Sequence, residues 1–138
     1  MLLVDTNVWM ERLLGQERSA EVGQFLDAVP ADALFITDFA FHSICLAMCR
    51  LNQQEGLQRF IRDLFESGGV VLLHLEAEEV LQVLEIMQRF HLDFDDAYQY
   101  VAAEKYDLTL VSFDADFDRT PRGRRTPGEI ILEIPPMR

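Results

Sequence analysis

Short apolar runs that each end close to an aspartate are the sequence feature that most constrains this chain. The runs at 1–4, 34–37 and 108–112 are followed by Asp5, Asp38 and Asp114. Amphipathic stretches at helical spacing separate them, a pattern typical of an α/β protein with a parallel sheet. Ligands of such sheets bind at the carboxyl ends of the strands. We therefore expect carboxylates from distant parts of the chain to converge at one sheet edge.

A cation is the simplest reason for carboxylates to gather, because they repel one another otherwise. Asp116 follows Asp114 by two residues, and Asp95 with Asp96 opens the helix predicted before the last run. Hard divalent cations bind carboxylate oxygens, so a hard-metal site is the first hypothesis. Any one of these aspartates alone would more simply cap a helix. Asp95 fits a first-turn position favoured by the helix dipole.

The remaining elements follow from apolar spacing and from glycine and proline breakers. Helices are expected from Thr6 or Asn7 onward and at 20–29, 39–53, 57–65, 77–90 and 96–106. Strands are expected at 2–4, 34–37, 70–75 and 108–112, with an edge strand at 130–134 and a loop at 115–128. The pattern predicts a three-layer α/β/α sandwich around a mainly parallel sheet of about five strands, formed as a single domain over 1–138.

Composition bears on the cellular compartment of the protein and on the class of its partners. No apolar run approaches the roughly 18–20 residues that cross a bilayer, and no basic stretch precedes the apolar N-terminus. A cytoplasmic protein without a membrane segment is therefore expected. The net charge of −12 argues against a nucleic-acid partner. That argument weakens if several carboxylates hold metal, and Arg119, Arg122, Arg124 and Arg125 crowd one short segment.

Three motifs resemble those of the PIN-domain nucleases, and within them the VapC-type toxins of toxin–antitoxin pairs. The resemblance lies in Leu3-Val4-Asp5-Thr6-Asn7, in Asp96-Ala97 followed by Ala102-Ala103-Glu104, and in Leu110-Val111-Ser112-Phe113-Asp114-Ala115-Asp116-Phe117. Each motif alone is a weak match. Their order and spacing together cover essentially the whole chain and make the match strong.

The resemblance implies a divalent-metal-dependent ribonuclease that uses Mg²⁺ or Mn²⁺, plausibly a toxin inhibited by a small antitoxin and assembled as a homodimer. The implied catalytic metal ligands are Asp5, Asp96 and Asp114. Asp116 would bind through water or serve a second ion. The residues implied to orient carboxylates or contact phosphate are Thr6, Asn7 and Ser112.

One position departs from the family pattern. The family places a glutamate about five residues beyond a Ser or Thr, and counting from Thr37 this position is His42. An imidazole suits Mn²⁺, iron or zinc better than Mg²⁺. His42 could shift metal preference, act on a proton, bind phosphate, or mark reduced activity, and Asp38 could replace the missing carboxylate. A PIN-like module that binds RNA or a protein without cutting is therefore the main rival.

Two residue groups carry weaker hypotheses. His42, Cys45 and Cys49 share one helical face and could form part of a zinc site, although buried core cysteines are the simpler reading. Arg122, Arg124 and Arg125 could contact RNA phosphates, bind an acidic partner segment, or lie in a plain solvated loop. Trp9 and Phe94 could line the cleft.

A phosphatase or phospho-receiver is a weaker rival, because Asn7 stands where a haloacid-type phosphatase needs a second aspartate.

Overall fold

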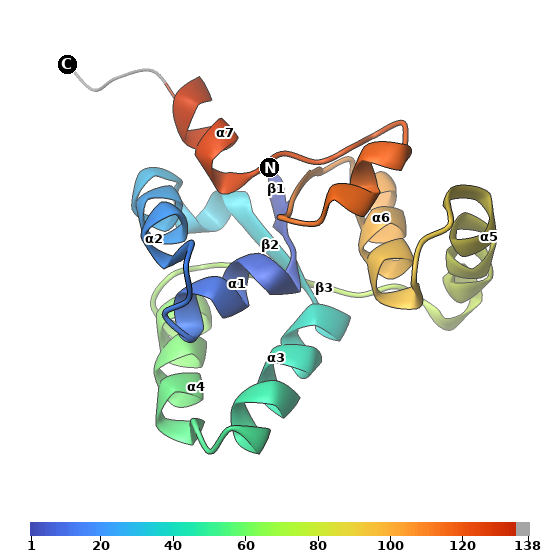
Figure 1. Ribbon diagram of the computed structural model, residues 1–138. Helices are drawn as coiled ribbons and strands as arrows, with labels where there is room; N and C mark the ends of the chain where they lie inside the picture. Colours follow the sequence, from blue (N-terminus) through green and yellow to red (C-terminus); the bar gives the residue numbers. More distant parts are fainter. Residues whose placement is uncertain (135–138) are drawn as a thin grey trace.

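The computed structural model describes residues 1–134 and contains one parallel sheet (Figure 1). Its strands are β1 (Leu2–Val4), β2 (Leu34–Thr37), β3 (Val71–Leu73) and β4 (Thr109–Val111), in the order β3-β2-β1-β4. All three pairings are parallel. The expected α/β class is confirmed, and the carboxyl ends of β1, β2 and β4 lie at one edge of the sheet.

Helices connect the strands and cover both faces of the sheet. They are α1 (Thr6–Leu13), α2 (Ser19–Ala28), α3 (Asp38–Arg50), α4 (Gln54–Ile61), α5 (Val80–Phe90), α6 (Phe94–Tyr106) and α7 (Pro127–Glu133). Short helical turns add η1 (Ala31–Ala33), the π-helical η2 (Arg62–Glu66), η3 (Ala77–Glu79) and η4 (Ala115–Arg119). Within residues 1–134, none of the helices has the length and apolar character needed to span a membrane.

Two apolar clusters divide the core along the sheet. Val4 packs in the cluster formed with α1, α2, α3, α4 and α7. Leu3, its neighbour in β1, packs in the other cluster with α5 and α6. Successive side chains of a strand point to opposite faces, so β1 supplies both layers. This arrangement gives the three-layer sandwich, with α5 and α6 together on one side (Figure 1).

The predicted edge strand at 130–134 is wrong, because residues 130–133 lie in α7 and Ile134 is the C-cap of this helix. Thr126 accepts the Glu129 N–H and the Glu129 side chain accepts in return, which forms a capping box with proline at the first helical position. Ile130 is buried and Leu132 is 87% exposed, as one face of a helix requires. The β-branched run had favoured a strand, but the cap determines the outcome.

The place of a fifth strand is taken by a single residue. Arg125 forms a parallel bridge with Val111. The Arg125 N–H donates to the carbonyl of Leu110 at 2.8 Å, and its carbonyl accepts from Ser112 N–H at 2.9 Å. The described part of the chain therefore has four strands and one bridge. That bridge holds the arginine-rich segment against the carboxyl end of β4.

Candidate active site

Asp5 stands at the junction between β1 and α1, where it serves as the N-cap of the helix. Its Oδ1 accepts the Thr6 N–H at 2.8 Å. The backbone N–H of Asp5 donates to the carbonyl of Val111, which ties this junction to β4. The residue is only 5% exposed. An apolar strand followed at once by a helix thus fixes a carboxylate at the sheet edge.

Side chains from three separate elements hold both carboxylate oxygens of Asp5. Gln99 Nε2 in α6 donates to Oδ1 at 3.0 Å. Ser112 Oγ, after β4, donates to Oδ2 at 2.8 Å, and Asn7 Nδ2 in α1 lies 3.4 Å from the same atom. This set of donors favours the ionised form and fixes the orientation of the carboxylate.

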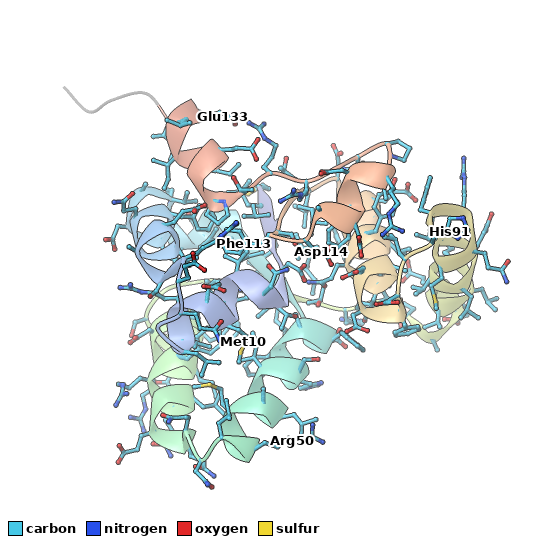
Figure 2. All side chains as sticks on the ribbon, viewed as in Figure 1. Met10, Arg50, His91, Phe113, Asp114 and Glu133 are labelled. Carbon is cyan, nitrogen blue, oxygen red and sulfur yellow. The ribbon has the colours of Figure 1, made fainter. Side chains whose placement is uncertain are left out.

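Three further carboxylates form a group close by. Asp96, Asp114 and Asp116 each offer one oxygen, and these oxygens all lie within 4.8 Å of one another. Asp96 comes from the first turn of α6, whereas Asp114 and Asp116 come from the segment after β4. Figure 2 shows Asp114 in that segment, beside α6. Asp5 is not a member of this three-residue group but lies near enough to act on its charge. We call these four residues the acidic site.

Burial and repulsion disfavour the charged form of two of these carboxyls, Asp96 and Asp5. The pKa of Asp96 is raised to about 8, first by burial and then by the Asp114 carboxylate, with a smaller contribution from Asp5. Burial also raises the pKa of Asp5, against the lowering effect of the hydrogen bonds from Gln99 and Ser112. Without a cation, the acidic site therefore holds its charge at a cost in free energy.

Ser112 links the carboxylates through its hydroxyl group. Ser112 Oγ donates to Asp5 Oδ2 and accepts from Asp114 N–H at 3.0 Å and from Asn7 Nδ2 at 3.2 Å. Asn7 Oδ1 in turn accepts the Phe113 N–H at 3.2 Å. Both residues therefore orient the backbone that carries Asp114. Thr6 participates through its backbone N–H.

Gln99 is a site residue that the sequence analysis missed. It is 1% exposed. Its Oε1 accepts from Thr37 Oγ1 at 2.6 Å while its Nε2 donates to Asp5. Thr37 also accepts the Ala40 N–H as the cap of α3. We call Thr37, Gln99 and Asp5 the polar bridge, because they connect the ends of β2 and β1 through α6. The available signal was one polar residue inside the buried stretch 97–103.

His42 and Asp38 lie apart from the group of three carboxylates. His42 is exposed and lines a separate pocket together with Asp38. Asp38 Oδ1 accepts from the Tyr98 hydroxyl at 2.8 Å and from Phe39 N–H. Among residues 1–134, the carboxylate group includes neither an imidazole nor a carboxylate from α3.

The cysteines do not form the suggested zinc site in the part of the chain described. His42, Cys45 and Cys49 are not among the residues whose ligand atoms converge there. Cys45 packs against the core and burial raises the pKa of its thiol. Cys49 is exposed, so the simpler core reading holds for Cys45 and is wrong for Cys49. The face shared by these residues points partly outward, because α3 buries Ile44 and Met48 instead.

The arginine-rich segment, residues 119–125, pairs its cations with acidic side chains. Arg122 pairs with Asp107, Arg124 with Asp118, and Arg125 with Glu129 and Glu133. Arg119 pairs with Asp116, so it alone of these reaches the acidic site. Arg124 also donates to the carbonyl of Ser112 at 3.2 Å, and its side chain is only 17% exposed. These arginines are thus partly structural.

The donor set of the acidic site fits a hard divalent cation. It consists of carboxylate oxygens from separate elements, held close together by serine, asparagine and glutamine. Oxygen ligands and partial exposure suit Mg²⁺ or Mn²⁺, which retain waters when bound. After burial, repulsion by Asp114 is the next cause of the raised pKa of Asp96, and a bound cation would offset that repulsion. Asp116, with 48% of its side-chain surface exposed, stands at the open rim.

Fold and site together define a class: an α/β protein whose parallel sheet carries a cluster of carboxylates at its carboxyl edge. The family model described as the PIN domain matches residues 2–123. The chain therefore belongs to the PIN-domain family, as its three motifs predicted. No curated protein sequence matches it significantly.

Solved structures share the fold along nearly the whole chain. A toxin–antitoxin complex from Klebsiella pneumoniae is 23% identical, with a TM-score of 0.73 over 92% of this chain and 98% of that one. VapC20 of Mycobacterium tuberculosis, a toxin that cleaves the sarcin–ricin loop, is 18% identical, with a TM-score of 0.73 over 86% and 93%. FitAcB from Neisseria gonorrhoeae is 20% identical, with a TM-score of 0.69 over 92% and 98%. At these identities the likeness establishes a common fold.

Proposed function

We propose that this protein is a divalent-metal-dependent ribonuclease that hydrolyses RNA phosphodiester bonds. The observation that carries the proposal is the convergence of Asp96, Asp114 and Asp116 within 4.8 Å, next to the buried Asp5. A PIN-domain chain with this arrangement has the ligands that phosphodiester hydrolysis needs. The sarcin–ricin loop cleavage of VapC20, which has the same fold, supports RNA as the substrate.

Each residue of the acidic site has a distinct part in this proposal. Asp5, Asp96 and Asp114 would hold the cation, and Asp116 would bind it through water or hold a second one. When bound, the cation supplies Lewis-acid stabilisation of the phosphate and a more acidic water. Ser112 and Asn7 keep Asp5 and Asp114 oriented, and Gln99 holds Asp5 from the other side. No side-chain nucleophile is required.

The direct test is cleavage of labelled, structured RNA by purified protein with Mg²⁺, Mn²⁺ or EDTA. Asp96→Asn, prepared in parallel, is the matched variant. We expect cutting that requires metal and that the variant loses. Cutting that continues in EDTA, or in Asp96→Asn at the wild-type rate, would contradict the proposal. A preference for Mn²⁺ would be assigned to the carboxylates of the acidic site, because His42 lines a separate pocket.

The second part of the proposal concerns partners. The Klebsiella structure is a toxin–antitoxin complex, which supports a small antitoxin protein as a partner of this chain. The test is to co-express the short open reading frame next to the gene and to measure co-purification and inhibition of cleavage. A neighbouring product that neither binds nor inhibits would count against the toxin role.

A homodimer is proposed as the assembly. Exposed leucines on α5 support it, since Leu81 and Leu84, one turn apart on this helix, are 71% and 49% exposed. Large exposed apolar surface commonly marks an interface. Light scattering coupled to size exclusion should give twice the chain mass of 15.9 kDa. A monomer at all concentrations would refute this assembly.

A non-cutting PIN-like module is the second candidate. The observation that favours it is His42, which stands at the family's glutamate position and lies outside the group of carboxylates. His42→Glu discriminates the two functions. A wild type that binds RNA and metal without cutting, together with a cutting His42→Glu variant, would establish a module whose activity was lost at this position.

A further inference from the structure

A pocket of about 350 Å³ opens between the amino-terminal parts of α3 and α6. We call it the aromatic pocket, and its lining includes Phe39, Phe94, Tyr98, Asp38, His42 and Ser43. Phe94 is the first residue of α6, and Asp96 follows it in the same first turn. The pocket and the acidic site therefore share one helix start, which lies beside the start of α3 (Figure 1).

The aromatic walls of this pocket are held in place. The Phe39 ring centroid lies 5.8 Å from that of Phe94 and 5.3 Å from that of Tyr98. The Tyr98 hydroxyl donates to Asp38 and accepts the Leu75 N–H at 3.0 Å, which fixes the ring. Phe39 and Phe94 remain partly exposed. The walls thus offer preformed aromatic surface at low entropic cost to a ligand.

Hydrogen-bonding groups surround the aromatic walls. Both side-chain hydrogen bonds of Asp38 fall on Oδ1, so Oδ2 remains an acceptor for a ligand. His42 is exposed and Ser43 lies next to it. A flat ligand with a polar edge matches this set. A purely apolar segment would cover the Asp38 carboxylate without a partner, which is unfavourable.

We propose that the aromatic pocket holds one unstacked nucleobase of the RNA whose scissile phosphate lies at the acidic site. This inference rests on the proposed ribonuclease function. Proteins read single-stranded RNA by stacking splayed bases on aromatic rings and by bonding to their polar edges. Phe39 and Phe94 supply the stacking surface. His42, Ser43 and Asp38 contact the edge of the base.

The test uses an RNA that the wild type cuts, with each nucleotide near the cut replaced in turn by an abasic one. At one position, the replacement should lower kcat/KM about tenfold or more. Phe94→Ala should lower kcat/KM on the intact RNA by a similar factor and lose its sensitivity to that abasic position. Phe94→Tyr should keep the wild-type kcat/KM on the intact RNA and the sensitivity to that abasic position. Tyr106→Ala is the matched control, because Tyr106 is an exposed aromatic residue at the far end of α6.

The outcomes separate this inference from the function on which it rests. Abasic sensitivity that persists undiminished in Phe94→Ala overturns the base pocket and leaves the nuclease intact. Absence of cutting by the wild type contradicts the nuclease. The pocket is then tested by binding of a short RNA that contains 2-aminopurine. The wild type should quench the fluorescence of this base, and Phe94→Ala should abolish the quenching. Loss of a dimer in Phe94→Ala, with no change in quenching, would assign the pocket to a second copy of the chain.

Discussion

The acidic site and the arginine-rich segment differ in how their charged side chains are arranged. In the acidic site, Asp96 lies close to Asp114 and Asp116, and burial with repulsion raises the pKa of Asp96 to about 8. In the arginine-rich segment, Arg122, Arg124 and Arg125 each pair with an acidic side chain outside the site. Within residues 1–134, the pair between Arg119 and Asp116 is the only ion pair that joins the two regions.

Among residues 1–134, the protein pairs Asp116 at the rim with Arg119 but gives Asp5, Asp96 and Asp114 no ion pair. Exposed ion pairs contribute little to stability, so the paired arginines chiefly fix the path of the segment. Asp5, the most buried of these three, is held instead by neutral donors, namely Ser112, Asn7 and Gln99. Neutral donors fix orientation and leave the charge available to an external cation.

The largest expected effect is the loss of cleavage in Asp96→Asn. The amide preserves the shape of the side chain and removes one charge from the acidic site, so activity should fall on the order of a thousandfold. Single-turnover cleavage in Mg²⁺ and Mn²⁺ measures the effect. Asp95→Asn is the control, because it removes the same charge from the neighbouring residue of α6, which lies outside the group of carboxylates. Equal losses in both variants would mean that only the summed charge matters.

A smaller loss is expected when the polar bridge is broken. Gln99→Met keeps the volume and removes both hydrogen bonds, so Mn²⁺ affinity and activity should fall about 10- to 100-fold, as for other residues behind a metal ligand. Isothermal titration with Mn²⁺ measures the affinity. Gln88→Met, an exposed substitution on α5, should change neither quantity.

The far end of the polar bridge gives a sharper version of this experiment. Thr37 donates to Gln99 within the bridge and accepts the Ala40 N–H as the cap of α3. Thr37→Ser should retain Mn²⁺ affinity, whereas Thr37→Val should lose part of it. Additive effects of Thr37→Val and Gln99→Met would show that the two residues do not act as one unit.

Arg124 should matter for stability more than its neighbours in the arginine-rich segment. It donates to the Ser112 carbonyl from a mostly buried position, so Arg124→Ala should cost about 1–2 kcal/mol of unfolding free energy. Arg125→Ala, which removes only exposed side-chain pairs with Glu129 and Glu133, should cost less than about 0.5 kcal/mol. Urea denaturation of both variants measures the difference. Equal costs would contradict a structural role specific to Arg124.

The metal-free protein should lose stability as the pH rises. Asp96 has a folded-state pKa of about 8, above its ordinary value of 3.8, so the folded state binds the proton more tightly than the unfolded state. The unfolding free energy therefore falls between these two values as the pH increases. At pH 8 in EDTA, Asp96→Asn should exceed the wild type by about 1 kcal/mol, or roughly 3–5 °C in Tm, after allowance for solvent screening. Near pH 4 the two proteins should melt together.

The smallest effect is expected from the cysteines. Cys45→Ala with Cys49→Ala should leave bound metal unchanged, because the thiols lie outside the acidic site. Elemental analysis of the purified protein measures this. Loss of stoichiometric zinc in the double variant would restore the zinc hypothesis.

Local signals in the sequence predicted most of the fold and the positions of the carboxylates. Asp5, Asp96 and Asp114 could be located because short apolar runs and helix starts determine which residues lie at the carboxyl edge of the sheet. The segment at 130–134 was misassigned because its β-branched residues were weighed above the Thr126–Glu129 capping box. That capping signal was present in the sequence.

Other features depend on contacts that local patterns do not encode. Gln99 bonds to Asp5 and Thr37, which lie far away along the chain, so no short motif marks its role. The position of His42 depends on the rotation of α3 about its own axis. That rotation is set by Ile44 and Met48 packing in the core, and a helical spacing alone does not give it.

Asp5 performs two tasks with one side chain, since it caps α1 and belongs to the acidic site. Asparagine ranks with aspartate as a helix cap, and the codons of the two residues differ by one nucleotide. A single base change at this position can therefore leave a folded protein that lacks one carboxylate of the acidic site. In a lineage that no longer benefits from the activity, variants that keep the fold and the surface but have lost the activity would arise readily.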